Sequence, residues 1–277
     1  MMKTFTLDLW EGFTYAGEGP DGFRPTLNCY LLKSGAPRPA VLVLPGSGYF
    51  QCSPREAEDL AVRFNAEGYH AFVLWYSCAP RRHPVPILDC NRAFTIIRSH
   101  AAEWVIDPSK VALMGFSAGG HLALSQSLYY AKGFAAAPGI DVSQCRPDAL
   151  ILCYSVVSSG VFAHRGSFDC LLGEHPDAAL LELHSLEKNI SADLPPVFLW
   201  HTWTDDAVPV ENSLLLADAL RRAGVVFEMH IFPDGRHGLS LATEATGEGD
   251  PGNINLHAAQ WFPLCVNWVK KTFGATA

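Results

Sequence analysis

The sequence predicts an α/β fold in which a mainly parallel sheet is covered by helices on both faces. Residues 40–44, 111–114 and 149–153 form short, continuous apolar runs, which are typical of strands buried on both sides. Segments with helical periodicity alternate with these runs, as they do in βαβ units. Two earlier strand-like segments, 4–10 and 26–32, are joined by a glycine-rich turn region and suit an antiparallel start to the sheet.

The elements after residue 44 follow a regular order. The sequence predicts a helix at 56–67, a strand at 70–75, a helix at 86–100, a strand at 111–114, a helix at 120–130, a strand at 149–153, an irregular segment at 154–194, a strand at 197–201, a helix at 210–223, a strand at 226–231 and a helix at 255–273. We expect one domain over residues 1–277, with 154–194 as a short cap insertion.

The composition and net charge of the chain argue against some classes of binding partner. The chain has 277 residues, of which 49% are apolar and 17% charged, an ordinary globular balance for one large domain. The formal charge of −8 argues against nucleic acid or an anionic membrane surface as a partner. The first residues contain no apolar stretch long enough for a signal peptide or membrane span, so a cytoplasmic location is expected. Nothing in the sequence indicates the oligomeric state.

The eight cysteines show no paired spacing and no Cys-x-x-Cys motif. In a large cytoplasmic enzyme such cysteines are expected to be reduced and to fill the core. His164, Cys170 and His175 lie near one another in sequence, but their spacing matches no zinc motif. We therefore expect no metal site and no cofactor.

A candidate nucleophile lies between a predicted strand and a predicted helix. The pentapeptide Gly-Phe-Ser-Ala-Gly at 115–119 directly follows the apolar run 111–114 and leads into the helix at 120–130. This order is typical of a nucleophile elbow. The turn is so sharp that a Cβ atom on either glycine would clash. Ser117 is therefore expected to project from the turn, beside the positive end of the helix.

With this elbow, the sequence resembles the α/β-hydrolase superfamily, and within it the small bacterial acetyl xylan and feruloyl esterases. The resemblance extends from about residue 26 onwards. Besides 115–121, the matching stretches are Leu-Pro-Gly-Ser-Gly-Tyr at 44–49, Trp-His-Thr-Trp-Thr-Asp-Asp-Ala-Val-Pro-Val-Glu-Asn-Ser at 200–213 and Phe-Pro-Asp-Gly-Arg-His-Gly-Leu-Ser-Leu-Ala at 232–242. The resemblance implies an α/β-hydrolase fold, with catalytic residues in the chain order Ser, Asp or Glu, then His.

The expected general base is His237. A serine hydroxyl is a weak nucleophile until a base takes its proton. His237 follows the strand at 226–231, at the edge where open α/β sheets place their sites, and Gly235 and Gly238 let the loop present an imidazole. Three other downstream histidines fit less well. His230 lies within a predicted strand and His201 lies at the end of one. His121 follows Ser117 by only one helical turn, and a packed role is expected for it.

The acid that orients the base has two adjacent candidates, Asp205 and Asp206, which follow the strand at 197–201. The family pattern places the acid shortly before Val208-Pro209, and this spacing favours Asp205. Asp206 is then expected to be a solvated loop residue or a cap for the following helix.

Backbone N–H groups are expected to hold the oxyanion. One donor should be Ala118, and the others should come from the loop after the strand at 40–44. In related lipases and esterases this loop is His-Gly-Gly-Gly, whereas residues 45–48 are Pro-Gly-Ser-Gly. Because the donors are backbone groups, both Ser47 and Gly48 remain candidates.

Aromatic residues near these loops are candidates for substrate binding, through stacking on a sugar ring or an aromatic acyl group, or for walls of the pocket: Tyr49, Phe50, Trp203 and Tyr154. The cap insertion adds candidates for polar contacts: Ser155, Ser158, Ser159, His164 and Arg165.

Together these features predict a serine carboxylesterase that forms an acyl-enzyme on Ser117, with His237 as base and then acid and Asp205 as its orienting group. The resemblance implies short acyl esters of sugars as substrates, first of all acetyl groups on xylo-oligosaccharides and secondly feruloyl esters. Two alternatives stay open: a serine peptidase of the prolyl-oligopeptidase type, and a non-catalytic binding protein on a hydrolase fold.

Overall fold

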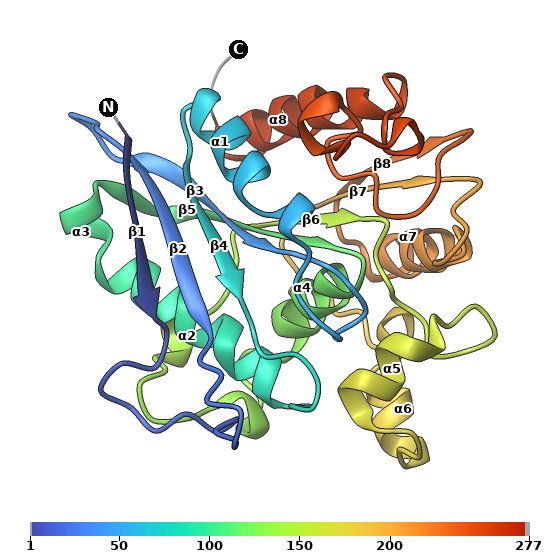
Figure 1. Ribbon diagram of the computed structural model, residues 1–277, viewed down its shortest axis with the longest axis horizontal. Helices are drawn as coiled ribbons and strands as arrows, with labels where there is room; N and C mark the ends of the chain where they lie inside the picture. Colours follow the sequence, from blue (N-terminus) through green and yellow to red (C-terminus); the bar gives the residue numbers. More distant parts are fainter. Residues whose placement is uncertain (1, 275–277) are drawn as a thin grey trace.

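The computed structural model describes residues 2–274. Across these residues, eight strands form one sheet (Figure 1). In spatial order they are β1 (Met2–Asp8), β2 (Thr26–Leu32), β4 (His70–Trp75), β3 (Arg38–Leu44), β5 (Ile106–Phe116), β6 (Ala149–Cys153), β7 (Val197–Thr202) and β8 (Phe227–Phe232). β2 pairs antiparallel with β1 and β4, and all other pairs are parallel. The prediction of a mainly parallel sheet with an antiparallel start is confirmed.

Helices cover both faces of the sheet (Figure 1). They are α1 (Glu58–Ala66), α2 (Val85–Ser99), α3 (Ala101–Trp104), α4 (Ala118–Tyr129), α5 (Arg165–Leu172), α6 (Ala178–Leu183), α7 (Glu211–Ala223) and α8 (Trp261–Thr272). None of those in residues 2–274 has both the length and the apolar character that a membrane crossing requires.

Strand β3 shows why both faces are covered. Its Val41 and Val43 pack in the core that contains α1 and α8, whereas Leu42 and Leu44 pack in the core that contains α2, α4 and α7. Successive side chains of a strand point to opposite faces, so a continuous apolar run needs a partner on each side.

The segment between β6 and β7 is more regular than expected. The prediction of an irregular stretch at 154–194 was wrong, because this cap contains α5 and α6. Phe168 and Leu171 hold α5 in place because they are buried in the core that contains α2, α4 and α7. The carboxylate of Asp177 accepts the backbone N–H of Leu180 at 2.7 Å and so caps α6.

The last helix begins later than expected. The sequence predicted a helix from residue 255, but α8 begins at Trp261. The side chain of Asn255 accepts the N–H of Ala258 at 3.0 Å, which holds the preceding residues in a tight turn. Pro263 lies in the first turn of α8, the part of a helix that tolerates its missing N–H group.

The eight cysteines all lie within the described residues as free thiols, and six are buried. Cys52 and Cys170 are only partly buried. Among residues 2–274, no group of three or more His, Cys, Asp or Glu side chains is arranged to hold a metal ion.

The ends of β3 and β5 meet α4 with almost no space between backbones. A Cβ atom on Gly115 would lie 2.2 Å from the carbonyl oxygen of Gly119. A Cβ atom on Gly119 would lie 2.2 Å from the carbonyl oxygen of Leu44 and 2.5 Å from that of Pro45. Both glycines are therefore required by contact with backbone, which cannot rotate away as a flexible side chain can.

We predict that Gly119→Ala lowers the free energy of unfolding by about 3 kcal/mol or more, because strand and helix must separate to admit the methyl group. Gly35→Ala is the matched control, since its Cβ would meet nothing within 4 Å, and it should change stability by less than about 0.5 kcal/mol. Urea unfolding of both variants measures the difference, and equal stabilities would contradict the proposed clash.

Candidate active site

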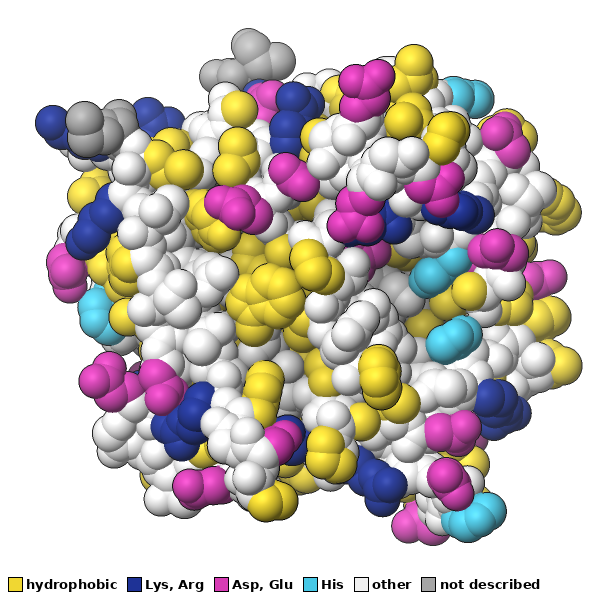
Figure 2. Space-filling view, viewed as in Figure 1, with side chains coloured by type: hydrophobic (Ala, Val, Ile, Leu, Met, Phe, Trp, Pro, Cys, Tyr) yellow, Lys and Arg dark blue, Asp and Glu magenta, His cyan; other side chains and the backbone are white. Residues whose placement is uncertain are grey.

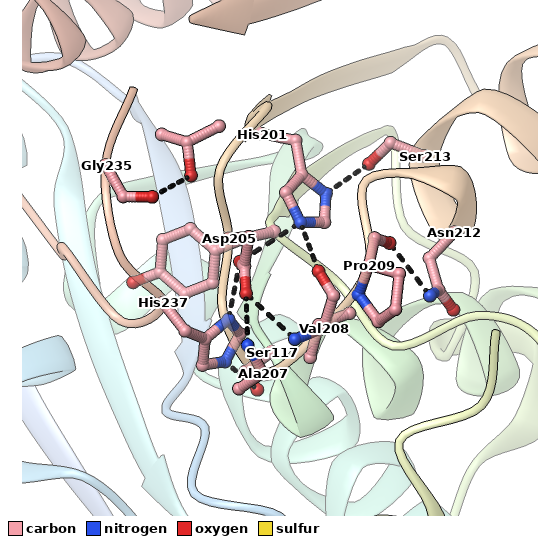
Figure 3. Close-up of polar contacts among 12 residues, drawn as sticks. Ser117, His201, Asp205, Ala207, Val208, Pro209, Asn212, Ser213, Gly235 and His237 are labelled. Carbon is pink, nitrogen blue, oxygen red and sulfur yellow. Dashed lines mark hydrogen bonds and ion pairs between the residues drawn. The ribbon is translucent and has the colours of Figure 1, made fainter. Parts of the chain in front are cut away.

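Ser117, His237 and Asp205 form a continuous hydrogen-bonded chain (Figure 3). The hydroxyl of Ser117 donates to Nε2 of His237 at 2.7 Å, and Nδ1–H of His237 donates to Oδ2 of Asp205 at 2.7 Å. Ser117 has φ 53° and ψ −119°, a strained conformation at the start of α4. In this arrangement the histidine can take the serine proton while the carboxylate stabilises the resulting imidazolium.

The carboxylate of Asp205 is almost fully hydrogen-bonded. Oδ1 accepts the backbone N–H groups of Ala207 at 3.0 Å and Val208 at 2.8 Å, while Oδ2 faces His237 and also His201 at 3.1 Å. Burial by itself raises the pKa of Asp205, but the hydrogen bonds from the two histidines outweigh it and hold that pKa well below its usual range. Asp205 is thus a charged acceptor for His237 at neutral pH.

The sequence alone assigned no role to His201 in the site. Its Nε2 lies 3.1 Å from Oδ2 of Asp205 and 3.0 Å from the carbonyl oxygen of Val208, two acceptors, so Nε2 carries the proton. Nδ1 then accepts the hydroxyl of Ser213 at 2.8 Å. The ring therefore orients the Asp205 carboxylate from behind. The one available signal was its position at the end of β7, four residues before Asp205.

Asp206 is an exposed loop residue, which is one of the two expected possibilities, and it does not cap α7, whose N-cap is Val210. In addition, Oδ1 of Asp206 accepts the backbone N–H of His237 at 3.0 Å, a contact that the sequence did not predict. Its side chain is exposed, but it connects the two loops that carry Asp205 and His237. The two adjacent carboxylates thus hold the histidine differently, one through its ring and the other through its backbone.

The candidate oxyanion loop has an unusual backbone. Ser47, Gly48 and Tyr49 have φ values of 100°, 65° and 61°, three left-handed residues in a row. The N–H of Gly46 donates to Glu56 at 2.7 Å, so it is occupied. Within residues 2–274, the N–H groups of Ser47, Gly48 and Ala118 have no hydrogen-bond partner. These three groups are therefore available to bind an oxyanion.

Tyr49 holds this loop against α4. The residue is only 2% exposed, and its hydroxyl donates to Nδ1 of His121 at 2.9 Å. Nε2–H of His121 donates to the carbonyl oxygen of His184 at 3.1 Å. The imidazole of His121 thus packs beneath the turn at Ser117, as expected, and connects α4 to the loop.

Glu56 lines the site although the sequence analysis did not identify it. Its Oε1 accepts the hydroxyl of Tyr154 at 2.7 Å, and its Oε2 accepts the N–H of Gly46. Burial raises the pKa of Glu56, and these two hydrogen bonds act in the opposite direction. No motif marked this residue, because its partners are distant in the chain.

An open cleft of about 440 Å³ lies in front of Ser117. We refer to it as the Ser117 cleft; it is lined by Ser47, Gly48, Phe50, Gln51, Ser53, Arg55, Glu56, Ser117, His164, Gly166, Cys170, His237 and Gly238. Of the five cap residues proposed for polar contacts, His164 alone lines this part of the described surface. Its Nδ1 lies 2.8 Å from the hydroxyl oxygen of Ser167.

The four aromatic candidates differ in position. Phe50 lines the Ser117 cleft and is 70% exposed. Trp203 is exposed but faces a separate surface hollow with Asp206 and Pro209. Substrate binding is the wrong expectation for Tyr49 and Tyr154, because each is only 2% exposed and neither lines the Ser117 cleft. The ring of Tyr154 packs 5.1 Å from that of His237, and its hydroxyl binds Glu56.

Comparison with known proteins shows similarity to esterases over most of the chain. The BD-FAE family model matches residues 27–220. Endo-1,4-beta-xylanase B of Butyrivibrio fibrisolvens is 37% identical over 91% of this chain and 40% of its own length. Acetylxylan esterase of Xylanibacter ruminicola is 30% identical over 87% of this chain and 47% of its own length. The chain thus spans less than half the length of each of these two relatives.

Solved structures match over nearly their full length. The acetyl ester-xyloside bifunctional hydrolase from Caldicellulosiruptor lactoaceticus has a TM-score of 0.87 and 40% identity, with 99% of this chain and 97% of that chain covered. The carboxylesterase Cest-2923 from Lactobacillus plantarum has a TM-score of 0.80 and 25% identity, with 100% and 99% covered.

Substitution of the two adjacent aspartates should lower kcat to very different extents. Asp205→Asn should lower kcat on p-nitrophenyl acetate by roughly 10³- to 10⁴-fold near neutral pH, because the amide favours the wrong tautomer of His237. Asp206→Asn should cost less than about tenfold, since its amide oxygen can still accept the N–H of His237. The reverse ranking would transfer the orienting role to Asp206, and two mild effects would place it elsewhere.

Acidification should act on stability through the buried histidines. Burial lowers the pKa of His121 to about 4 and that of His184 to about 2, from 6.5. Between pH 6.5 and about pH 4, the unfolded chain binds protons on these rings that the folded protein does not bind, so this contribution to stability is lost as pH falls. Asp89, whose pKa burial raises to about 6, and Glu56 act in the opposite direction.

A variant of His184 isolates the contribution of this histidine to the pH dependence of stability. Between pH 6.5 and 4.5, the free energy of unfolding of His184→Gln should depend on pH less steeply than that of the wild type, by about 1 kcal/mol per pH unit. Urea titrations across this range measure both slopes. Equal slopes would show that His184 is not held neutral by burial.

Proposed function

The chain belongs to the BD-FAE family and has an α/β-hydrolase fold, and from this premise we propose that it is a serine carboxylesterase. In this proposal it removes short acyl groups, above all acetyl groups, from carbohydrates such as xylo-oligosaccharides. The observation that carries the proposal is the hydrogen-bonded chain from Ser117 through His237 to Asp205 at the base of an open cleft.

In the acylation step, the Ser117 hydroxyl attacks the ester carbonyl carbon while His237 takes its proton. The carbonyl oxygen becomes an oxyanion, which the free N–H groups of Ala118 and of Ser47 or Gly48 stabilise. As the oxyanion reverts to a carbonyl, the ester C–O bond breaks, His237 gives the proton to the departing sugar oxygen, and the acyl group stays on Ser117. The ionised carboxylate of Asp205 stabilises the imidazolium in between.

In the deacylation step, water replaces the alcohol. His237 takes a proton from the water as it attacks the acyl carbon, and the same N–H groups hold the second oxyanion. Return of the proton to Ser117 releases the carboxylic acid and restores the enzyme.

The substrate class is supported by two relatives whose names describe acetyl ester chemistry on xylose-containing compounds: the acetylxylan esterase and the acetyl ester-xyloside bifunctional hydrolase. The open cleft is compatible with a bulky alcohol, and its lining mixes polar side chains such as Gln51, Arg55 and His164 with Phe50. Such a surface suits a hydroxyl-rich alcohol better than a long acyl chain.

The test is hydrolysis by purified protein of acetylated and feruloylated xylo-oligosaccharides and of peptide substrates. We expect acetate release as the main activity. Ser117→Ala should lower it by about 10³-fold or more without loss of folding, because the nucleophile is gone while the site remains. A fluorophosphonate probe should label the wild type but not the variant.

Each alternative has a distinct signature in this experiment. More than a tenth of the wild-type activity in Ser117→Ala would refute Ser117 as the nucleophile. Peptide hydrolysis without ester hydrolysis would indicate a serine peptidase. Failure of the probe to label Ser117, together with no turnover, would indicate a binding protein.

A further inference from the structure

A second hollow adjoins the Ser117 cleft. It has a volume of about 350 Å³ and shares Phe50 and Gln51 with the cleft, so these residues form a ridge between the two. Its lining also includes Asp21, Phe23 and Arg81, and Trp75 at the end of β4. Figure 2 shows hydrophobic side chains gathered at the centre of this face, over the end of β4. A ligand that leaves the cleft over the Phe50 ridge therefore enters this hollow.

The apolar part of the hollow combines aromatic side chains with Cys52, Cys78 and Ala79. Phe23 and Trp75 are partly buried, so their rings are fixed by packing. Phe50 is 70% exposed, although it lies in a loop whose neighbour Tyr49 is buried. Aromatic faces that remain in water beside a cleft offer flat apolar area to a ligand.

The polar part of the hollow is a fixed ion pair. The Arg81 side chain is only 8% exposed. Its Nη1 donates to Oδ2 of Asp21 at 2.8 Å, its Nε donates to the carbonyl oxygen of Gly17 at 2.9 Å, and its guanidinium lies 4.7 Å from the ring centre of Phe23. These contacts hold the wall of the hollow in place without any ligand.

Asp21 is the group of this pair that can still bind a ligand. The hydrogen bonds from Arg81 lower its pKa to about 2, so its carboxylate is ionised at neutral pH. Its side chain is about half exposed. A carboxylate has about four lone-pair positions; two N–H groups of Arg81 and the backbone N–H of Phe23 occupy three of them, so capacity remains to accept a hydroxyl group.

We infer that this second hollow is a subsite for a neutral sugar residue next to the esterified one, an inference that rests on the proposed esterase function. An acetyl group is small, so most of an oligosaccharide substrate must extend beyond Ser117 on its alcohol side. A sugar ring has apolar C–H faces and hydroxyl donors, which match the aromatic faces and the Asp21 carboxylate. Because Arg81 neutralises Asp21, the hollow favours neither a cationic nor an anionic ligand.

The first experiment compares kcat/KM on monoacetylated xylotriose with that on acetylated xylose. In the wild type the trisaccharide should be favoured by about tenfold, which corresponds to about 1.4 kcal/mol of additional binding. Phe50→Ala and Asp21→Asn should each reduce this ratio by about threefold or more. Leu256→Ala is the matched control, because Leu256 is also 70% exposed but lines neither the Ser117 cleft nor the second hollow. The ratio of the two kcat/KM values in this variant should equal that of the wild type.

The second experiment uses unesterified xylotriose as an inhibitor of p-nitrophenyl acetate hydrolysis, and thus needs no turnover of sugar esters. Inhibition should weaken by about threefold or more in Asp21→Asn and Phe50→Ala relative to the wild type. Thermal unfolding of each variant checks that the fold is kept. If Asp21→Asn fails to fold, Phe50→Ala decides the outcome.

The outcomes separate the subsite from the proposed function. Hydrolysis of both acetylated sugars with equal kcat/KM, or a ratio unchanged in both variants, overturns the subsite and leaves the esterase function intact. No hydrolysis of either acetylated sugar, with p-nitrophenyl acetate still cleaved, overturns the proposed function and the subsite with it. Loss of feruloyl ester hydrolysis alone in the variants assigns the hollow to an aromatic acyl group and overturns the subsite.

Discussion

The close approach of the turn at Ser117 to the end of β3 is the constraint on which the rest of the site depends. A Cβ atom on Gly119 would overlap the carbonyl oxygens of Leu44 and Pro45, and one on Gly46 would lie 2.8 Å from Cβ of Ser117. Backbone atoms cannot move aside as flexible side chains can. The distance between the serine and the candidate oxyanion loop is therefore set by glycine contacts, and the other groups are arranged around it.

Two buried carboxylates then join the loops that surround the serine. Asp205 binds backbone N–H groups of its own loop and the rings of His201 and His237. Glu56 joins Gly46 to Tyr154, whose ring packs on His237. A buried carboxylate is costly unless its oxygens are hydrogen-bonded, so these contacts favour one arrangement of the loops. By fixing the loops, these contacts hold the backbone N–H donors in place, and preorganised donors are the main requirement for stabilising a developing oxyanion.

The sequence was most informative where a local pattern has one physical explanation. Continuous apolar runs predicted the doubly covered strands β3, β5 and β6, and β6 has the expected bounds, as do the separately predicted β2 and β4. The glycines at 115 and 119 predicted a turn that only a strand–helix elbow requires. Patterns were less informative where local and tertiary effects compete. The cap helices α5 and α6 are short and depend on burial and capping, and Asn255 delays α8 through a side-chain contact.

By itself, the sequence determined the fold class and the elbow at Ser117, because these follow from periodicity and glycine placement, and its family resemblance implied the order of the candidate acid and base. Only the tertiary structure decided which side chains face the cleft. Phe50 is exposed on it, whereas its neighbour Tyr49 turns inward to His121, and Glu56 enters the site through partners distant in sequence. The physical reason is that the direction of a loop side chain depends on backbone dihedral angles and on hydrogen-bond partners that folding brings together, and neither has a period that a sequence can display.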